Sequence, residues 1–383
     1  MSEQATLIAP PLRVLLISVD EFSGVRLPFQ SALERCGCEV RYRRLSLRVL
    51  GWRRYWHLLR MIVSALLTYR RDAHALINRT AAAFEARSKA CKVLVDRNLD
   101  VQIVLMLGAT NSSMYWGPLP PGIRFAFYTD YMNLITKGLP DPGIELLERS
   151  VSAHWNVLEG EFLRTLWHIF VMGAHVRAAI AAAYEVPIEK ITVIGAGPAQ
   201  DVDIERDGYS KRFDNQTMLF VGKRATVKGL GVLLHAFSRV RAEHPGAILH
   251  VVANQTVNMQ GVICHQAVEP ASLRQLYYAA SIFVMPAFKE PLGLVFLEAM
   301  WSKCACVGTT TGSMPEIIQD GETGLLVPPG DDLALAARLS ELLGDPRRTR
   351  SMGERGYAAA RRYWRWDLVA SRMLQVLHGS SPC

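Results

Sequence analysis

The sequence has no uninterrupted apolar run of the roughly 18 residues that a helix needs to cross a bilayer, although half of its residues are hydrophobic. It also has no basic segment ahead of its first short apolar run, which Glu3 precedes, so we predict no signal peptide. These two absences favour a cytoplasmic protein without a membrane-spanning anchor.

Cysteine is scarce, and its pattern argues against two classes of protein. The 383 residues include seven cysteines, an odd number, and no two of them form a Cys-x-x-Cys pair. A disulfide framework and a zinc site both need paired spacings that are missing here. We therefore expect buried thiols in a reducing compartment, and no metal site.

The glycine fingerprint of dinucleotide-binding proteins is missing as well. Residues 13–19 predict a buried parallel strand, residues 20–24 a turn with one glycine, and residues 27–35 an amphipathic helix. Strand, turn and helix in this order open a Rossmann-like unit, but the turn has no G-x-G-x-x-G. The segment therefore predicts a Rossmann-like fold without a dinucleotide site.

Length and net charge indicate the number of domains and the kind of partner that the protein binds. A chain of 383 residues suggests two domains rather than one. The net charge of +8 at pH 7 comes mostly from arginine and favours anionic partners. Nucleotides, phospholipid headgroups and nucleic acids all meet that requirement.

A strand, a loop and a helix in the C-terminal half contain the first candidate site. Residues 281–286 predict a buried strand, and Pro286 and Pro291 bracket the loop that follows it. From Gly293 onward the apolar spacing is helical. The amides of Gly293 and Leu294 then lie at a helix N-terminus, which favours an anion.

Two glutamates accompany this helix start. Glu290 lies in the loop, and Glu298 lies one to two turns into the helix. Together with the anion site, their carboxylates suit a phosphorylated ligand that carries hydroxyl groups. In the alternative interpretation, Glu290 only caps the helix and Glu298 is a solvated surface residue.

A pair of cations precedes them in the chain. Residues 218–221 predict a strand that ends at Gly222 and Lys223. Lys228 follows five residues later, just before a helix that begins near Leu230. Two cations at a strand end can offset the charge of a pyrophosphate without a metal.

These segments are followed by residues 312–327, which contain a Pro-Glu pair. In order and spacing, the three segments resemble the nucleotide-sugar half of the retaining, family-4-type glycosyltransferases of the GT-B fold. The resemblance covers residues 165–375 well and residues 1–160 only loosely. The sequence departs from the family where Lys223 replaces the usual Arg and where residues 303–305 replace a Gly-x-Pro.

The resemblance implies an α/β fold of the GT-B type, in which two Rossmann-like doubly wound domains face each other across a cleft. Residues 1–198 would form the acceptor-binding domain, and residues 199–361 the nucleotide-sugar-binding domain. The terminal helix, in residues 362–383, would pack back on the first domain.

The resemblance also implies roles for individual residues. Glu298 would accept hydrogen bonds from the ribose hydroxyls, and Glu290 would face the donor sugar as a catalytic residue, with Lys228 beside it at the diphosphate. The residues expected to bind the donor are Gly222, Lys223, Lys228, Gly293, Leu294 and Glu298.

Asp130 is the third candidate for a catalytic role. It follows the predicted strand at residues 124–128, and ligands of open α/β sheets gather beyond strand carboxyl ends. In the resembling family, a His or Asp at the end of a comparable strand faces the transferred sugar. The alternative is that Asp130 forms an ordinary Asx turn.

Between residues 41 and 71 the sequence interleaves nine arginines with tryptophans, tyrosines and many aliphatic residues. On a helix, Arg53, His57, Arg60 and Ser64 would share one stripe. Such a composition suits an anionic membrane interface. One alternative is an internal helix that packs on the sheet with its arginines reaching outward. Contact with nucleic acid is not expected, because no recognition motif accompanies the charge.

The resulting hypothesis is a glycosyltransferase that moves a hexosyl group from a nucleotide diphosphate sugar with retention of configuration. The resemblance implies a reaction without a cofactor or an obligate metal, and the D-x-D at residues 201–203 is discounted as a metal motif because it falls in a predicted linker. The acceptor would be a lipid-linked or cell-envelope glycan at the inner face of the membrane. Two alternatives stay open: another GT-B enzyme such as a sugar-nucleotide epimerase, and a non-catalytic, nucleotide-binding, membrane-associated protein.

Overall fold

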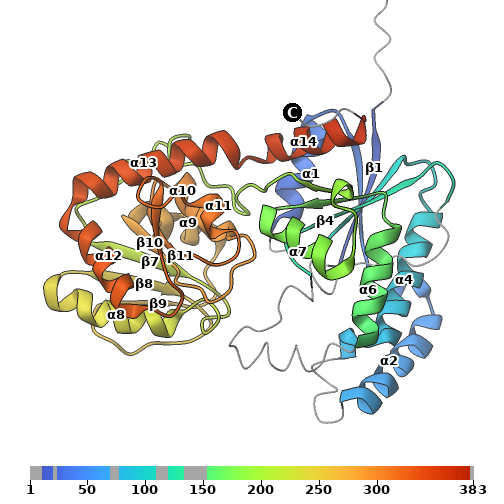
Figure 1. Cartoon of the computed structure of the whole chain (residues 1–383), viewed down its shortest axis with the longest axis horizontal. Coiled ribbons are helices and arrows are strands. Elements are labelled where there is room, and N and C mark those ends of the chain that lie inside the picture. Colours follow the sequence, from blue (N-terminus) through green and yellow to red (C-terminus); the bar gives the residue numbers. More distant parts are fainter. Residues whose placement is uncertain (1–10, 20–23, 70–76, 109–119, 133–152, 380–383) are drawn as a thin grey trace, which may run out of the picture.

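The computed structural model describes residues 11–19, 24–69, 77–108, 120–132 and 153–379. The predicted turn at residues 20–23 lies outside these ranges, as do Arg70 and Arg71. Within them the chain forms two parallel β-sheets covered by helices, one from the N-terminal half and one from the C-terminal half (Figure 1).

The first sheet has the strand order β2-β1-β3-β4-β5-β6, and all neighbouring strands are parallel. Its strands are β1 (Arg13–Ser18), β2 (Glu39–Arg44), β3 (Ile103–Leu107), β4 (Arg124–Thr129), β5 (His168–Val171) and β6 (Ile191–Val193). Strands such as β3, in which every residue is buried, read as continuous apolar runs because helices cover both faces.

The second sheet has the order β12-β11-β10-β7-β8-β9 and is also parallel throughout. Its strands are β7 (Thr217–Val221), β8 (Ile248–Val252), β9 (Val262–His265), β10 (Ile282–Val284), β11 (Ala305–Thr309) and β12 (Gly324–Val327). The prediction of two Rossmann-like, doubly wound α/β sheets is confirmed. The order reverses between β7 and β10, where ligands of this fold bind.

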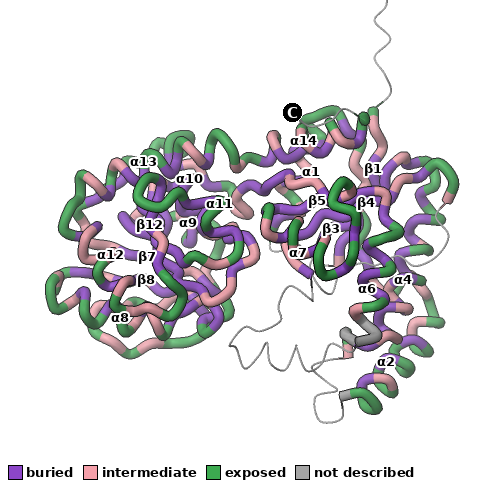
Figure 2. The backbone as a smooth tube through the Cα atoms, in the orientation of Figure 1, coloured by how far each residue is buried: buried purple, intermediate pink, exposed green. Residues whose placement is uncertain are grey.

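The helices of the N-terminal half flank the first sheet, whose buried strands run through the middle of the lobe (Figure 2). They are α1 (Arg26–Arg35), α2 (Arg53–Tyr69), α4 (Ala81–Asp96), α6 (Ala153–Thr165) and α7 (Ala174–Tyr184), with the short helices η1 (Leu47–Leu50), η3 (Ile77–Arg79) and η5 (Ile188–Lys190). The start of α4 is fixed by Thr80, whose hydroxyl accepts a hydrogen bond from the Ala83 amide at 3.0 Å.

Helix α2 does not pack on the sheet. Its main partners are α4, η1 and η3, and it lies at the outer end of the N-terminal lobe (Figure 1). Among its residues whose burial is described, 53–68, only His57, Met61 and Ala65, which are spaced four residues apart, are buried. Since the remaining apolar side chains face outward, the interpretation as an internal helix on the sheet is wrong.

The helices of the C-terminal half are α8 (Leu230–Glu243), α9 (Pro270–Ala279), α10 (Leu294–Trp301), α11 (Met314–Ile317), α12 (Asp332–Gly344), α13 (Pro346–Tyr363) and α14 (Trp366–Leu377). Helices α13 and α14 run in succession from the second lobe to the first, where α14 packs on α1 (Figure 1). Arg35 and Asp367 form an ion pair at 2.6 Å, and the Trp366 indole N–H donates to the Pro198 carbonyl at 2.8 Å.

Two sequence predictions concern the burial of the cysteines and the presence of membrane-spanning helices. Cys38, Cys91, Cys304 and Cys306 are buried free thiols, as expected, whereas Cys36 is exposed. In the described ranges, no helix combines the length and the apolar character that a membrane span requires.

Candidate active site

The loops after β7 and β10 pack on each other at the reversal of the second sheet. The Phe288 amide donates to the Val227 carbonyl at 2.9 Å, which ties the two loops together. Gly229 has a φ of 76°, and a Cβ there would lie 1.9 Å from the Pro286 carbonyl oxygen. Only glycine therefore permits this approach, which delivers Lys228 to the loop that contains Glu290.

Lys228 and Glu290 form an ion pair, with 2.8 Å between Nζ and Oε2. Their side chains are 21% and 9% exposed, so the pair is largely removed from water. The sequence assigned these residues to different parts of the donor, the diphosphate and the sugar. Their contact means that one bound ligand would meet both charges at the same point.

The N-terminus of α10 lies next to this pair. Gly293 caps the helix with a φ of 100°, and a Cβ there would come within 2.3 Å of the Met314 side chain. Gly312 approaches as closely, since its Cβ would lie 1.9 Å from the Glu290 carbonyl oxygen. Close packing of these loops holds the first turn of α10, with the Leu294 amide, beside the Lys228–Glu290 pair.

Asp130 reaches the same place from the first sheet, just beyond β4. The pKa of its carboxyl is raised to about 6, chiefly by burial and also by the charge of Glu290, while Lys228 and His175 act in the opposite direction. Its Oδ1 is buried without a hydrogen-bond partner among the described residues. The local turn is made by Thr129, whose hydroxyl accepts from the Tyr131 amide at 3.1 Å. Asp130 is therefore a buried acceptor near Glu290 and Lys228.

Glu298 is buried in α10, with 3% of its surface exposed, so the interpretation as a solvated surface residue is wrong. The Tyr277 hydroxyl donates to its Oε2 at 2.8 Å. Burial raises its pKa to about 7, although Tyr277 and the backbone of Gln200 and Ala199 act in the opposite direction. The carboxylate thus faces the segment that connects the two sheets. Its role at a ribose stays a prediction.

The other predicted donor residues, Gly222 and Lys223, lie just after β7 and differ in exposure. Gly222 is buried after β7, and its amide donates to the Val252 carbonyl at 2.9 Å. Lys223 is exposed, so it has a different environment from Lys228. A further cation that sequence reasoning missed is Lys289, whose ammonium lies 4.0 Å from the centre of the Tyr131 ring.

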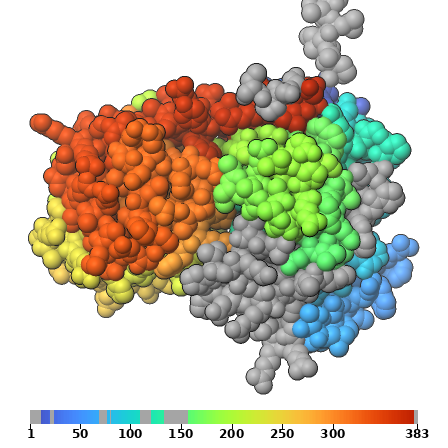
Figure 3. All heavy atoms as spheres, viewed as in Figure 1, coloured from blue at the N-terminus to red at the C-terminus, as the bar shows by residue number. Residues whose placement is uncertain are grey.

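Sequence reasoning also missed a contact between the two lobes. The Glu316 carboxylate accepts hydrogen bonds from the Ala174 amide at 2.7 Å and from the His175 amide at 3.0 Å, at the start of α7. Ser313 Oγ and His175 Nδ1 are 2.8 Å apart. The lobes meet in this region (Figure 3). In the sequence, Glu316 is visible only as part of the Pro-Glu pair of residues 312–327. No spacing of residues indicates that it contacts α7.

The D-x-D of the linker is engaged in structural contacts. Arg206 pairs with Asp201 at 2.6 Å, and the Tyr357 hydroxyl donates to Asp203 at 2.9 Å. Within the described ranges, no group of three or more His, Cys, Asp or Glu side chains is arranged to hold a metal ion.

Two parallel doubly wound sheets, with glycine-lined loops meeting between them, define the GT-B class of fold. The structure superposes on sucrose-phosphate synthase from Thermosynechococcus elongatus with a TM-score of 0.68, 96% of this chain and 98% of that chain covered, and 17% identity. Residues 215–345 match the family model described as Glycosyl transferases group 1. The matched segment contains the elements from β7 to α12.

Two curated relatives align with parts of the sequence. Alpha-maltose-1-phosphate synthase from Mycolicibacterium smegmatis is 39% identical over 110 residues, which are 27% of this chain and 28% of the relative. The GDP-mannose-dependent alpha-(1-6)-phosphatidylinositol monomannoside mannosyltransferase of the same organism is 26% identical over 185 residues, 43% of this chain and 48% of the relative. The aligned segments thus span less than half of either relative.

Proposed function

We propose that this protein is a glycosyltransferase that moves a hexosyl group from a nucleotide diphosphate sugar to an acceptor, with retention of anomeric configuration. The observation that carries the proposal is the largely buried Lys228–Glu290 pair, which lies beside the N-terminus of α10 and near the buried Oδ1 of Asp130. The family of residues 215–345 supports the same class of reaction.

The arrangement assigns each group a task. Negative charge develops on the diphosphate as the glycosidic bond breaks, and the Lys228 ammonium and the first amides of α10 stabilise it there. Because these groups supply positive charge directly, we propose that the reaction needs no metal. Glu290 and Asp130 offset the positive charge that develops on the sugar ring.

We further propose that the acceptor is a lipid-linked or cell-envelope glycan and that the enzyme works at the cytoplasmic face of a membrane. The support is the outward face of α2 together with Trp52, which directly precedes the helix: nine large apolar side chains from Trp52 to Leu67 are exposed there, beside several arginines. The mannosyltransferase relative carries a phospholipid acceptor in its name.

The test is a thermal-shift screen of purified protein against UDP-, GDP- and ADP-sugars, followed by turnover of the sugar that binds. Binding raises the melting temperature by mass action. We expect nucleotide diphosphate to be released faster when an acceptor extract is added, and equally fast in EDTA. Conversion of the donor to its epimer without any acceptor would overturn the proposal. Loss of activity in EDTA that Mn²⁺ restores would overturn its metal-free part.

A further inference from the structure

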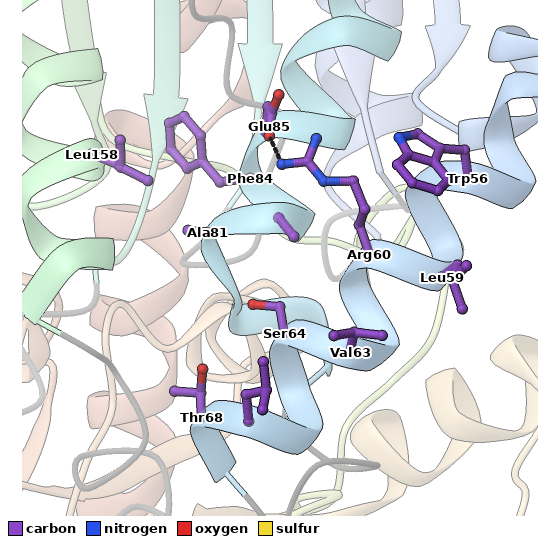
Figure 4. A pocket seen from close by; sticks show the side chains of 12 residues that line it. Trp56, Leu59, Arg60, Val63, Ser64, Thr68, Ala81, Phe84, Glu85 and Leu158 are labelled. Atoms are coloured by element: carbon purple, nitrogen blue, oxygen red, sulfur yellow. Dashed lines mark ion pairs between the residues drawn. The ribbon is translucent and has the colours of Figure 1, made fainter.

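A groove of about 660 Å³ runs between α2, the first turns of α4 and the side of α6. Its walls are apolar over most of their length, as Figure 4 shows. The residues that define it are Leu59, Val63 and Leu67 on α2, Ala82 and Phe84 on α4, and Leu158 on α6.

The fold leaves one side of this groove uncovered by any described side chain. Leu59, Val63 and Leu67 are 51%, 46% and 78% exposed, although they are large and apolar. They continue into the outward face of α2, where Trp52 is 78% and Ile62 45% exposed. Monomeric soluble proteins rarely expose a contiguous apolar surface of this kind without a partner.

The surroundings of the groove are cationic. No Asp or Glu occurs between residues 40 and 69. Arg60 lies at the groove and pairs with Glu85 at 2.9 Å, and Lys89 pairs with the same carboxylate at 2.9 Å. The one acidic side chain that lines the groove is therefore held by two cations.

A second groove, of about 640 Å³, also has Trp56 in its lining. Its lining has more basic residue types and includes Arg53, His57, Lys89 and Lys92 beside Leu50, Trp52 and Val93. One indole therefore borders both the apolar groove and a groove with several basic side chains. Tryptophan at such a boundary is typical of protein surfaces that meet a lipid headgroup region.

We propose that the apolar groove binds one hydrocarbon chain of an anionic phospholipid, while the phosphate lies over the basic groove and the outward face of α2 rests in the bilayer interface. The inference rests on the membrane placement in the proposed function and gives it a defined lipid site. Each methylene that leaves water on entering the groove tightens binding about fourfold. The cations add an attraction that salt weakens.

The first experiment measures the binding of a single hydrocarbon chain to the groove in the absence of a bilayer. The soluble probe is dansylaminoundecanoate. Ala82→Phe fills the groove from α4, and Ala242→Phe is the matched control on the exposed side of α8. We expect dansyl fluorescence to report binding by the wild type and the control, and at least tenfold weaker binding by Ala82→Phe. Equal binding by both variants, or no binding by the wild type, overturns the site.

The second experiment uses phosphatidylglycerol vesicles whose acyl chains carry bromine, which quenches nearby tryptophan. We expect the quenching to decrease in Trp56→Phe, because that indole lines both grooves, and Trp52, which lines the second groove, to account for quenching that remains. Unchanged quenching would overturn the proposal. Nucleotide-sugar thermal shifts should be the same in Ala82→Phe and wild type. If the wild type shows no such shift but binds the probe, the donor proposal fails and the lipid site stands.

Discussion

At the residue scale, Lys228 is the group whose removal is the clearest test of the diphosphate site. We expect Lys228→Ala to lower turnover by about 10² to 10³, which is the typical effect of losing one group that stabilises developing negative charge. The variant also leaves the Glu290 carboxylate largely buried without its ion-pair partner. The measurement is kcat at saturating donor. Lys228→Arg keeps the charge and should retain more activity. Near-normal turnover in Lys228→Ala would show that the diphosphate lies elsewhere.

Asp130 should make stability depend on pH. Burial raises the pKa of its carboxyl to about 6. At pH values between the ordinary pKa of an aspartate and about 6, the folded protein therefore binds a proton that the unfolded chain releases. Its contribution to stability therefore falls as pH rises through this range. We expect Asp130→Asn to unfold at higher urea concentration than wild type near pH 7, by on the order of 1 kcal/mol, and to show no gain near pH 4.

Asp214→Asn is the control for that measurement, since Asp214 is exposed and pairs only with Arg212 among the contacts described for it. It should show no gain near pH 7. A gain for Asp130→Asn that is the same at both pH values would mean that its cause is packing and not the buried charge.

Glu298 should affect donor binding more than chemistry. Ribose contacts are much the same in the ground state and the transition state, so Glu298→Ala should raise the donor KM with little change in kcat. Burial raises the pKa of Glu298 to about 7, so the wild-type donor KM should itself rise as pH falls through that value. A fall in kcat with unchanged donor affinity would instead place Glu298 at the reacting centre.

Single residues show what sequence could and could not predict at the site. Lys228 and Glu290 are predictable because each lies in a short loop between an apolar strand and a helix, and the spacing of such loops is visible in the sequence. The contacts of Glu316 with Ala174 and His175 join residues more than 140 positions apart. No local pattern connects such residues, because their proximity depends on how two separately folded lobes are placed.

At the scale of elements, α2 also shows that a local sequence pattern does not predict which distant element a segment contacts. Its helical spacing was predicted, but which face would be buried depends on its partner, and that partner is α4 and not the sheet. The buried positions His57, Met61 and Ala65 are small or moderate in size, while the larger apolar residues stay outside. The sequence thus predicted an amphipathic, basic helix, and only the structure shows that its apolar side is outward.

The outward face of α2 leads to a prediction about vesicles. We expect the protein to co-sediment with anionic liposomes at low salt and to be released as salt rises. Each arginine near an anionic surface contributes about 1 kcal/mol, so Arg53→Glu/Arg60→Glu should weaken binding by well over tenfold. Trp56→Ala should weaken it less and without changing the salt dependence. Arg239→Glu/Arg347→Glu applies the same charge change on the other lobe as a control. Wild type that stays in the supernatant at low salt would refute membrane contact.

At the scale of the whole molecule, the two lobes are joined in two different ways. Helix α14 holds them together from outside, through Arg35–Asp367 and the contact of Trp366 with the linker. Across the cleft, the contacts between described residues include the Glu316 carboxylate at the N-terminus of α7, next to Ser313 and His175, and the Lys289 ammonium over the Tyr131 ring. A carboxylate at a helix N-terminus is stabilised by unpaired amides and by the helix dipole. This contact can open without disturbing the core of either lobe.

We therefore predict that Glu316 sets how closed the cleft is. Burial raises the pKa of its carboxyl, but hydrogen bonds from His175 and Ala174 outweigh that effect and leave it below the ordinary value, so the contact persists until the solution is strongly acidic. Replacing a capping carboxylate costs about 1 kcal/mol, so Glu316→Ala should lower the ratio of closed to open molecules about fivefold. Small-angle scattering should show a larger radius of gyration, and the donor KM should rise. Glu243→Ala, an exposed change on α8, is the control. If Glu316→Ala keeps both the wild-type radius and the wild-type donor KM, α14 alone sets the domain arrangement and the cleft contact is incidental.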